Sequence, residues 1–213
     1  MNKYLILKID FRLLIILISA FIFTTVAGTL SHEFGHYLAG KYIGIDGKIH
    51  YASTSFSIPD DFVGIITRTD SFLITLGGPI QTILTSIIGL LLLYFNRKKI
   101  KSLGNLTIFH WIYIFMSLFW LRQTANFTLW IAKYLINGRF PNKMDEIKLA
   151  RNLEIPEWSI IFPTAVIGFI ITIYVIITYI PIKQRFTFII SGLIGGISGF
   201  YLWLDLFGKL ILP

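Results

Sequence analysis

The chain has 213 residues, of which 55% are hydrophobic and 16% are aromatic, while only 14% are charged. A soluble domain carries about a quarter charged residues, so this composition excludes an ordinary water-soluble protein and indicates a polytopic membrane protein. The net charge of +8 comes largely from basic residues beside apolar runs, as in NRKKIK at 96–101. That pattern is typical of membrane flanks, and we expect no nucleic-acid partner. Because the chain has no cysteine, disulfides and thiolate metal ligands are excluded.

Five uncharged runs are each long enough for a helix that crosses the roughly 30 Å hydrocarbon core of a bilayer. In chain order they occupy residues 13–31, 71–95, 103–121, 158–182 and 186–204. We expect the first run to be a retained helix rather than a signal peptide, because cleavage would cut through the helix that carries two histidines. The prediction is one all-α, multi-pass domain over residues 1–213, integral to a bacterial cell membrane and in contact with the lipid bilayer.

Residues 121–136, LRQTANFTLWIAKYLI, are too polar for an ordinary span facing lipid. Arg122 and Asn126 lie one helical turn apart and therefore share a face of a helix. We expect an interfacial or partly buried helix that continues the third run. A sixth membrane crossing is the alternative.

A short β-hairpin is expected between the first and second runs, within residues 47–69. Polar and apolar residues alternate over 53–58, PDD at 59–61 is a turn signal, and FVGIITRT follows at 62–69. Two roles remain open for this hairpin. It either caps the helices or presents a strand edge that holds an extended peptide by main-chain hydrogen bonds.

The segment HEFGH, residues 32–36, follows the first apolar run. His32 and His36 are four residues apart, so on a helix they lie about 40° from each other and can bind one ion. Glu33 lies on the adjacent flank, where it can accept a proton from a metal-bound water. Buried polar side chains are costly near a bilayer, which favours a functional role. The alternative is a helix end whose polar residues meet water.

HEFGHYLAG, residues 32–40, resembles the active-site helix of the site-2-protease-like intramembrane zinc metalloproteases, and His32, Glu33 and His36 occupy the three positions of their HExxH motif. LGGPI, residues 76–80, is similar to the second core segment of that family. Taken alone, this proline would fit near the first turn of a helix and would need no function. The resemblance implies a Zn²⁺ cofactor.

The resemblance also implies that an aspartate in a later segment is the third zinc ligand. Its closest counterpart is Asp145 in NKMDEIKLARNLEIP, residues 142–156, where the family's Asp-Gly pair is absent. In the alternative, Asp145 begins an amphipathic surface helix and interacts with the helix dipole. Only one of two adjacent helical residues can face the histidines, so Glu146 is expected to point to water or to Lys143 and Arg151.

The predicted function is a membrane-embedded zinc metalloendopeptidase, with Glu33 as general base and a membrane-associated protein or peptide as substrate. Arg122, Asn126 and Gly78 are candidates for contacting the substrate or the oxyanion. A polar contact between helices is the other role for Arg122 and Asn126. His50 and His110 are expected to be ordinary loop and helix residues.

Two other functions remain alternatives. A catalytically silent relative would bind membrane peptides without cutting them. A divalent-metal transporter would need ligands along a path across the membrane, and beyond the motif the apolar runs offer only His110. Di-iron membrane oxygenases need more histidines than the four in this chain.

Five crossings would place His32, His36, Gly78 and Asp145 on one side of the membrane. The basic segments of the opposite side favour a cytoplasmic location for that side. The family resemblance instead places the metal site toward the cytosol, so the two expectations about orientation conflict.

Overall fold

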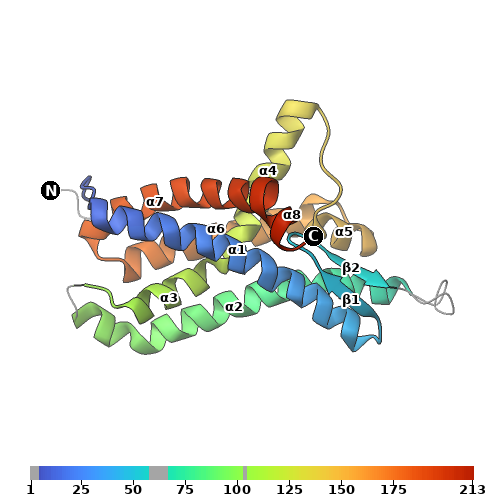
Figure 1. The fold of residues 1–213 in the computed structure, drawn as a ribbon, viewed down its shortest axis with the longest axis horizontal. Helices are drawn as coiled ribbons and strands as arrows, with labels where there is room; N and C mark the ends of the chain where they lie inside the picture. The colour runs from blue at the N-terminus through green and yellow to red at the C-terminus, as the bar shows by residue number, and fades with distance from the viewer. Residues whose placement is uncertain (1–4, 58–66, 103–104) are drawn as a thin grey trace.

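The computed structural model describes residues 5–57, 67–102 and 105–213. Long helices run side by side along the molecule, and a two-stranded hairpin lies at one end (Figure 1). By length and composition, four segments could cross a membrane, which indicates a multi-pass membrane protein. They are α1 (Phe11–Tyr42), α2 (Arg68–Ser102), α6 (Trp158–Tyr179) and the segment Ile182–Ile211. This last segment joins α7 (Ile182–Phe200), a π-helical stretch (Tyr201–Phe207) and α8 (Gly208–Ile211).

The first helix, α1, is longer than the apolar run that predicts it. It begins after Asp10, whose carboxylate accepts a hydrogen bond from the Leu13 N–H at 3.1 Å, a typical N-cap. With 32 residues it is about 48 Å long, and it continues past the histidine motif to Tyr42. The chain leaves the helix where Gly44 adopts a positive φ of 83°. The motif therefore lies inside the helix and not at its end.

The prediction of five membrane helices is wrong for the third run, 103–121. That region forms α3 (Ile108–Ser117) and a 3₁₀ turn (Leu118–Trp120), followed by α4 (Leu121–Asn137). Ten residues of α3 span only about 15 Å, half of a bilayer core. The helix breaks at Ser117, whose hydroxyl donates to the Ile114 carbonyl at 2.7 Å. Residues 121–136 were expected as a helix that continues the third run, and they do form the helix α4, which lies across the long helices (Figure 1).

The hairpin is present, but its strands are not the predicted pair. β1 (Asp46–Ile49) pairs antiparallel with β2 (Thr54–Ser57), so the expected first strand, 53–58, is the second strand. The expected turn and most of the following strand fall in 58–66, outside the described residues. The pairing shifts because the chain turns back directly after α1. The ring of Phe56 on β2 then packs where Gly40 and Gly47 have no side chain.

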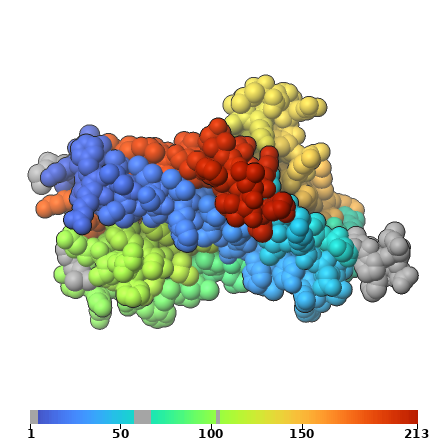
Figure 2. Space-filling model, viewed as in Figure 1, coloured from blue at the N-terminus to red at the C-terminus, as the bar shows by residue number. Residues whose placement is uncertain are grey.

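The main apolar core lies among α1, α2, α3, α6 and α7, and includes Leu17, Leu93, Ile114, Val175 and Phe188. A short helix, α5 (Asp145–Asn152), packs on α2 and α6. At the hairpin end the C-terminal residues lie against the turn between the strands, where the Tyr51 N–H donates to the Leu212 carbonyl at 2.9 Å. Figure 2 shows the end of α4 standing out from the rest of the surface.

Candidate metal centre

Three candidate ligand atoms from two helices converge at one point. His32 and His36 lie on α1, and Asp145 is the first residue of α5. Asp145 Oδ2 is 2.9 Å from His32 Nε2 and 3.3 Å from His36 Nε2, and the two Nε2 atoms are 3.1 Å apart. Two ligands bound tetrahedrally to one zinc at 2.0–2.1 Å would be about 3.3 Å apart. The triangle therefore has nearly the size that one zinc ion requires.

Hydrogen bonds on the far side of each imidazole determine where its proton lies. His36 Nδ1 is 2.7 Å from the Ile74 carbonyl, which can only accept, so Nδ1 carries the proton. His32 Nδ1 is 3.0 Å from the Thr82 hydroxyl, which itself donates to the Gly78 carbonyl at 3.1 Å. Thr82 is thus the acceptor for His32 as well. In the neutral imidazoles both Nε2 atoms present lone pairs to each other.

These lone pairs also face the Asp145 carboxylate, so three acceptors meet without a hydrogen between them. The repulsion is relieved by a cation or by protonation of one imidazole. Outer hydrogen bonds that fix the imidazole tautomer are typical of histidines that bind metal ions. The donor set of two imidazoles and one carboxylate could hold a divalent metal ion, of which zinc is one. Among the described residues, these three form the one cluster of histidine and acidic side chains that could hold a metal.

Glycines let the backbone of α2 approach the histidines closely. A Cβ placed on Gly78 would lie 2.6 Å from His32 Nε2 and 2.7 Å from His36 Cε1, too close for any side chain. Gly35 of α1 and Gly77 of α2 likewise meet backbone to backbone. Gly78 therefore faces the two Nε2 atoms themselves, and its lack of a side chain leaves the space beside these candidate ligand atoms open.

Pro79 lies inside α2, which begins at Arg68, and not near the first turn as its sequence context suggests. Proline has no N–H, so it cannot bond the Thr75 carbonyl four residues earlier, and its ring opens the helix locally. The preceding carbonyl, that of Ile74, is the acceptor for His36. The proline thus lies where α2 contributes a backbone group to the site.

The motif does not face water within the folded chain. His32, Glu33 and His36 are 0%, 5% and 8% exposed. This burial argues against a helix end whose polar residues simply meet solvent. Each side chain instead has a specific polar neighbour.

Glu33 is held by the hairpin, a contact that sequence reasoning missed. The Thr54 hydroxyl at the start of β2 lies 3.1 Å from Glu33 Oε2 and 2.9 Å from the Glu33 carbonyl, and it donates to them. A threonine at the start of a strand is common, so the sequence contains no distinctive signal for this contact. The hairpin therefore covers the motif and orients its glutamate.

Asp145 faces the histidines, whereas the expectation for Glu146 is wrong. Burial alone would raise the pKa of Asp145, but the close approach of the His32 and His36 imidazoles lowers it well below its usual range. Glu146 does not point to water, because it is only 1% exposed, and burial raises its pKa. Arg151, one of its two expected partners, pairs with Glu157 instead.

The polar residues of α4 lie close to this centre. Asn126 Nδ2 is 3.3 Å and 3.4 Å from the two carboxylate oxygens of Glu146 and donates to them, which ties α4 to α5. Arg122 is within electrostatic range of His32, Glu33 and Glu146, and its buried Nε has no hydrogen-bond partner in the described part of the chain. Asn126 thus makes a polar contact between helices, while Arg122 leaves a donor free.

The remaining two histidines have local partners. His50 Nε2 lies 2.8 Å from the Ser55 hydroxyl in the hairpin. His110 Nδ1 accepts from the Thr107 N–H at 3.2 Å at the start of α3. Neither belongs to the metal cluster.

Comparisons with protein-family models, with curated proteins and with solved structures found no match. The resemblance to site-2-protease-like enzymes therefore rests on the motif residues themselves.

Proposed function

We propose that this chain is a membrane-embedded zinc metalloendopeptidase that hydrolyses peptide bonds of membrane-associated proteins or peptides. The observation that carries the proposal is the convergence of His32 Nε2, His36 Nε2 and Asp145 Oδ2 beside the buried carboxylate of Glu33. The three ligands would leave a fourth position open, as catalytic zinc sites require. Zinc bound there would act as a Lewis acid and lower the pKa of a water molecule.

Glu33 is the general base in this proposal. Its carboxylate accepts a proton from the attacking water, and the Thr54 hydroxyl keeps that carboxylate in one orientation. Water adds to the peptide carbonyl, the C–N bond breaks, and the proton passes from Glu33 to the departing amine. Arg122 has an unpaired buried Nε–H and is the better candidate for stabilising the oxyanion, because Asn126 is already bonded to Glu146.

The two alternatives make different use of the same residues. A silent peptide-binding relative needs no general base, so the buried, hydrogen-bonded Glu33 favours an enzyme. A metal transporter needs successive ligand sets across the membrane, and the described residues contain one such set.

The proposal is tested on purified full-length protein in detergent, by zinc content and by cleavage of fluorescent single-span peptides. Glu33→Gln should keep zinc and lose cleavage, because it removes the base and no ligand. His36→Ala should lose both. Cleavage by Glu33→Gln at the wild-type rate would exclude this mechanism. Zinc uptake into liposomes that Glu33→Gln leaves unchanged, without any cleavage by the wild type, would favour the transporter.

A further inference from the structure

A small hollow lies at the end of α4. This part of the helix stands out from the molecule (Figure 2). Its volume is about 240 Å³, and it is lined by Lys133, Asn137, Arg139, Phe140, Pro141 and Asn142. α4 ends at Asn137, and the next residue, Gly138, has a φ of 68° that turns the chain back on itself. The ring of Phe140 then stacks on Trp130 and Tyr134, with centroids 4.0 Å and 4.2 Å away. The hollow is therefore built by a stacked aromatic turn.

The residues that line this hollow are positively charged or neutral, which favours binding of an anion. It contains two cations and two carboxamides and no carboxylate. Lys133 and Arg139 have no ion-pair partner within the described ranges. Four other cations at this end of the molecule do pair with acids, in the pairs Lys41–Asp46, Arg68–Glu154, Lys148–Asp145 and Arg151–Glu157. Two unpaired charges that face one cavity are complementary to a ligand with anionic oxygens.

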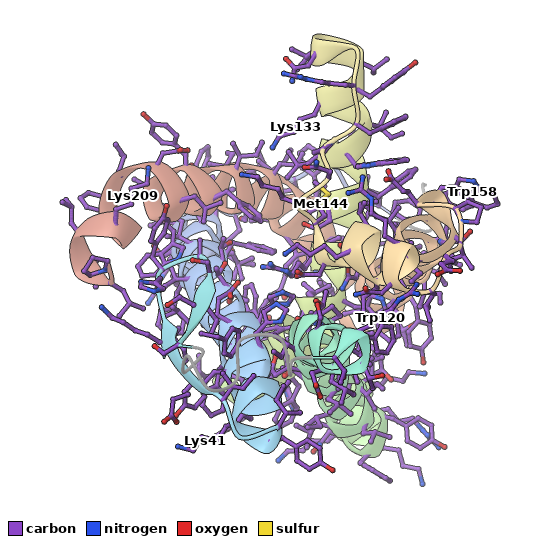
Figure 3. The ribbon with its side chains drawn as sticks, turned by 90° about the vertical axis from the view of Figure 1, so that its right-hand side faces the viewer. Lys41, Trp120, Lys133, Met144, Trp158 and Lys209 are labelled. Carbon is purple, nitrogen blue, oxygen red and sulfur yellow. The ribbon has the colours of Figure 1, made fainter. Side chains whose placement is uncertain are left out.

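The setting of the hollow points to lipid. α4 lies across the long helices (Figure 1). Figure 3 shows Lys133 on α4, farther from the centre of the molecule than Met144. A helix across the spans runs along the membrane surface, where aromatic and basic side chains gather. Leu135 and Ile136 beside the hollow are 76% and 79% exposed, which leaves them free to contact acyl chains.

We propose that this hollow binds the phosphate group of an anionic phospholipid. Lys133 and Arg139 contact the phosphate oxygens, Asn137 and Asn142 offer amide donors, and the apolar end of α4 lies among the acyl chains. The site is independent of the chemistry at the histidine cluster. A purely structural reading is that both cations interact with the negative end of the α4 dipole. That reading predicts a loss of stability on their removal and no preference among lipids.

The test measures binding of phosphatidylglycerol and phosphatidylcholine to full-length protein in neutral detergent by native mass spectrometry. The wild type should prefer phosphatidylglycerol. The double variant Lys133→Gln/Arg139→Gln should bind it roughly thirtyfold more weakly, and each single variant roughly fivefold, from the usual contribution of a basic residue near anionic lipid. Lys143→Gln is the matched control, because it removes the same charge from the same connection but does not line the hollow.

Equal binding of the two lipids by the wild type would overturn the proposal, as would an equal loss in Lys143→Gln. The single variants provide the same test should the double variant fail to fold. A further arm adds excess inorganic phosphate. Bound phosphatidylglycerol that resists displacement supports a lipid site, whereas displacement assigns the hollow to free phosphate and overturns the lipid assignment.

Discussion

Replacing Gly78 by alanine should disrupt the metal centre without touching any ligand. The new Cβ would lie 2.6 Å from His32 Nε2, whereas ordinary van der Waals contact begins near 3.4 Å. The imidazoles or the α2 backbone must therefore move by at least about 0.8 Å, the difference between these distances, because His36 Nε2 lies closer still to the new Cβ. A functional metal site tolerates deviations of only about 0.2 Å in its ligand distances. We expect zinc affinity to fall by roughly 100-fold, the upper end of what the loss of a supporting contact causes.

The assay is competition for zinc between the purified variant and a chromophoric chelator. Gly196→Ala is the matched control, because it makes the same change in another long helix where a Cβ would meet nothing within 4 Å. Alanine is the better helix former by about 1 kcal/mol, so a loss of helix propensity cannot explain weaker zinc binding in Gly78→Ala. The helical circular dichroism of both variants checks that the fold is kept.

The result that would refute this reasoning is wild-type zinc affinity in Gly78→Ala with the fold intact. It would mean that the two Nε2 atoms do not lie as close to Gly78 when the ion is bound. Weaker zinc binding in Gly196→Ala would equally show that the effect is not local.

Two further substitutions test the groups around the ligands. Glu146→Ala should weaken zinc binding by roughly tenfold, because it leaves Asn126 unpaired in a partly buried position and loosens α5 beside Asp145. Glu146→Gln keeps an acceptor and should bind zinc nearly as the wild type does. Equal affinity in both variants and the wild type would exclude this supporting role. Thr54→Val should slow peptide cleavage by roughly tenfold with zinc retained, because the Glu33 carboxylate loses the hydrogen bond from the Thr54 hydroxyl. Thr54→Ser keeps a hydroxyl and should cleave at the wild-type rate. Cleavage by Thr54→Val as fast as by the wild type would show that Glu33 needs no help from the hairpin.

The sequence predicts the part of the site that depends on local spacing. His32 and His36 face one point because they lie four residues apart on one helix. Glu33 follows from the same motif. The supporting contacts are different, because Thr82 and the Ile74 carbonyl belong to a helix some 40 to 50 residues away. Such contacts depend on how α1 and α2 pack, and no short pattern encodes that.

Two other expectations failed for a related reason. The strand Asp46–Ile49 was not foreseen as a partner of Thr54–Ser57, because alternation identifies a strand but not its neighbour, and this neighbour is set by where α1 ends. Glu146 was expected to point to water or to Lys143 and Arg151, because the angle between adjacent residues says which one faces the histidines and nothing about what covers the other. In the structure, Asn126 and α4 cover it.

The third run, 103–121, was wrongly expected to be a membrane helix, yet Asp145 still lies beside His32 and His36 as expected. Asp145 can reach His32 only if the chain returns to the motif end between α2 and α5. The chain makes that return through α3, the 3₁₀ turn and α4. Within a bilayer, such a helix break is stable only where other protein groups form hydrogen bonds with the backbone groups that the break leaves free. At the break the Ser86 hydroxyl donates to the Ser117 carbonyl at 2.6 Å. The Thr124 hydroxyl of α4 donates to the Ala165 carbonyl at 2.8 Å, which joins α4 to α6.

These hydrogen bonds allow the chain to bend inside the bundle, and the bend has a consequence for the site. A straight span over 103–121 would carry the chain outward at the membrane surface. The bend instead lays α4 across α6, with Asn126 directed at α5. Glu146 is thereby held from α4, and Asp145, its neighbour on α5, faces the two imidazoles. The same break that removes a membrane helix from the count therefore places the third candidate ligand.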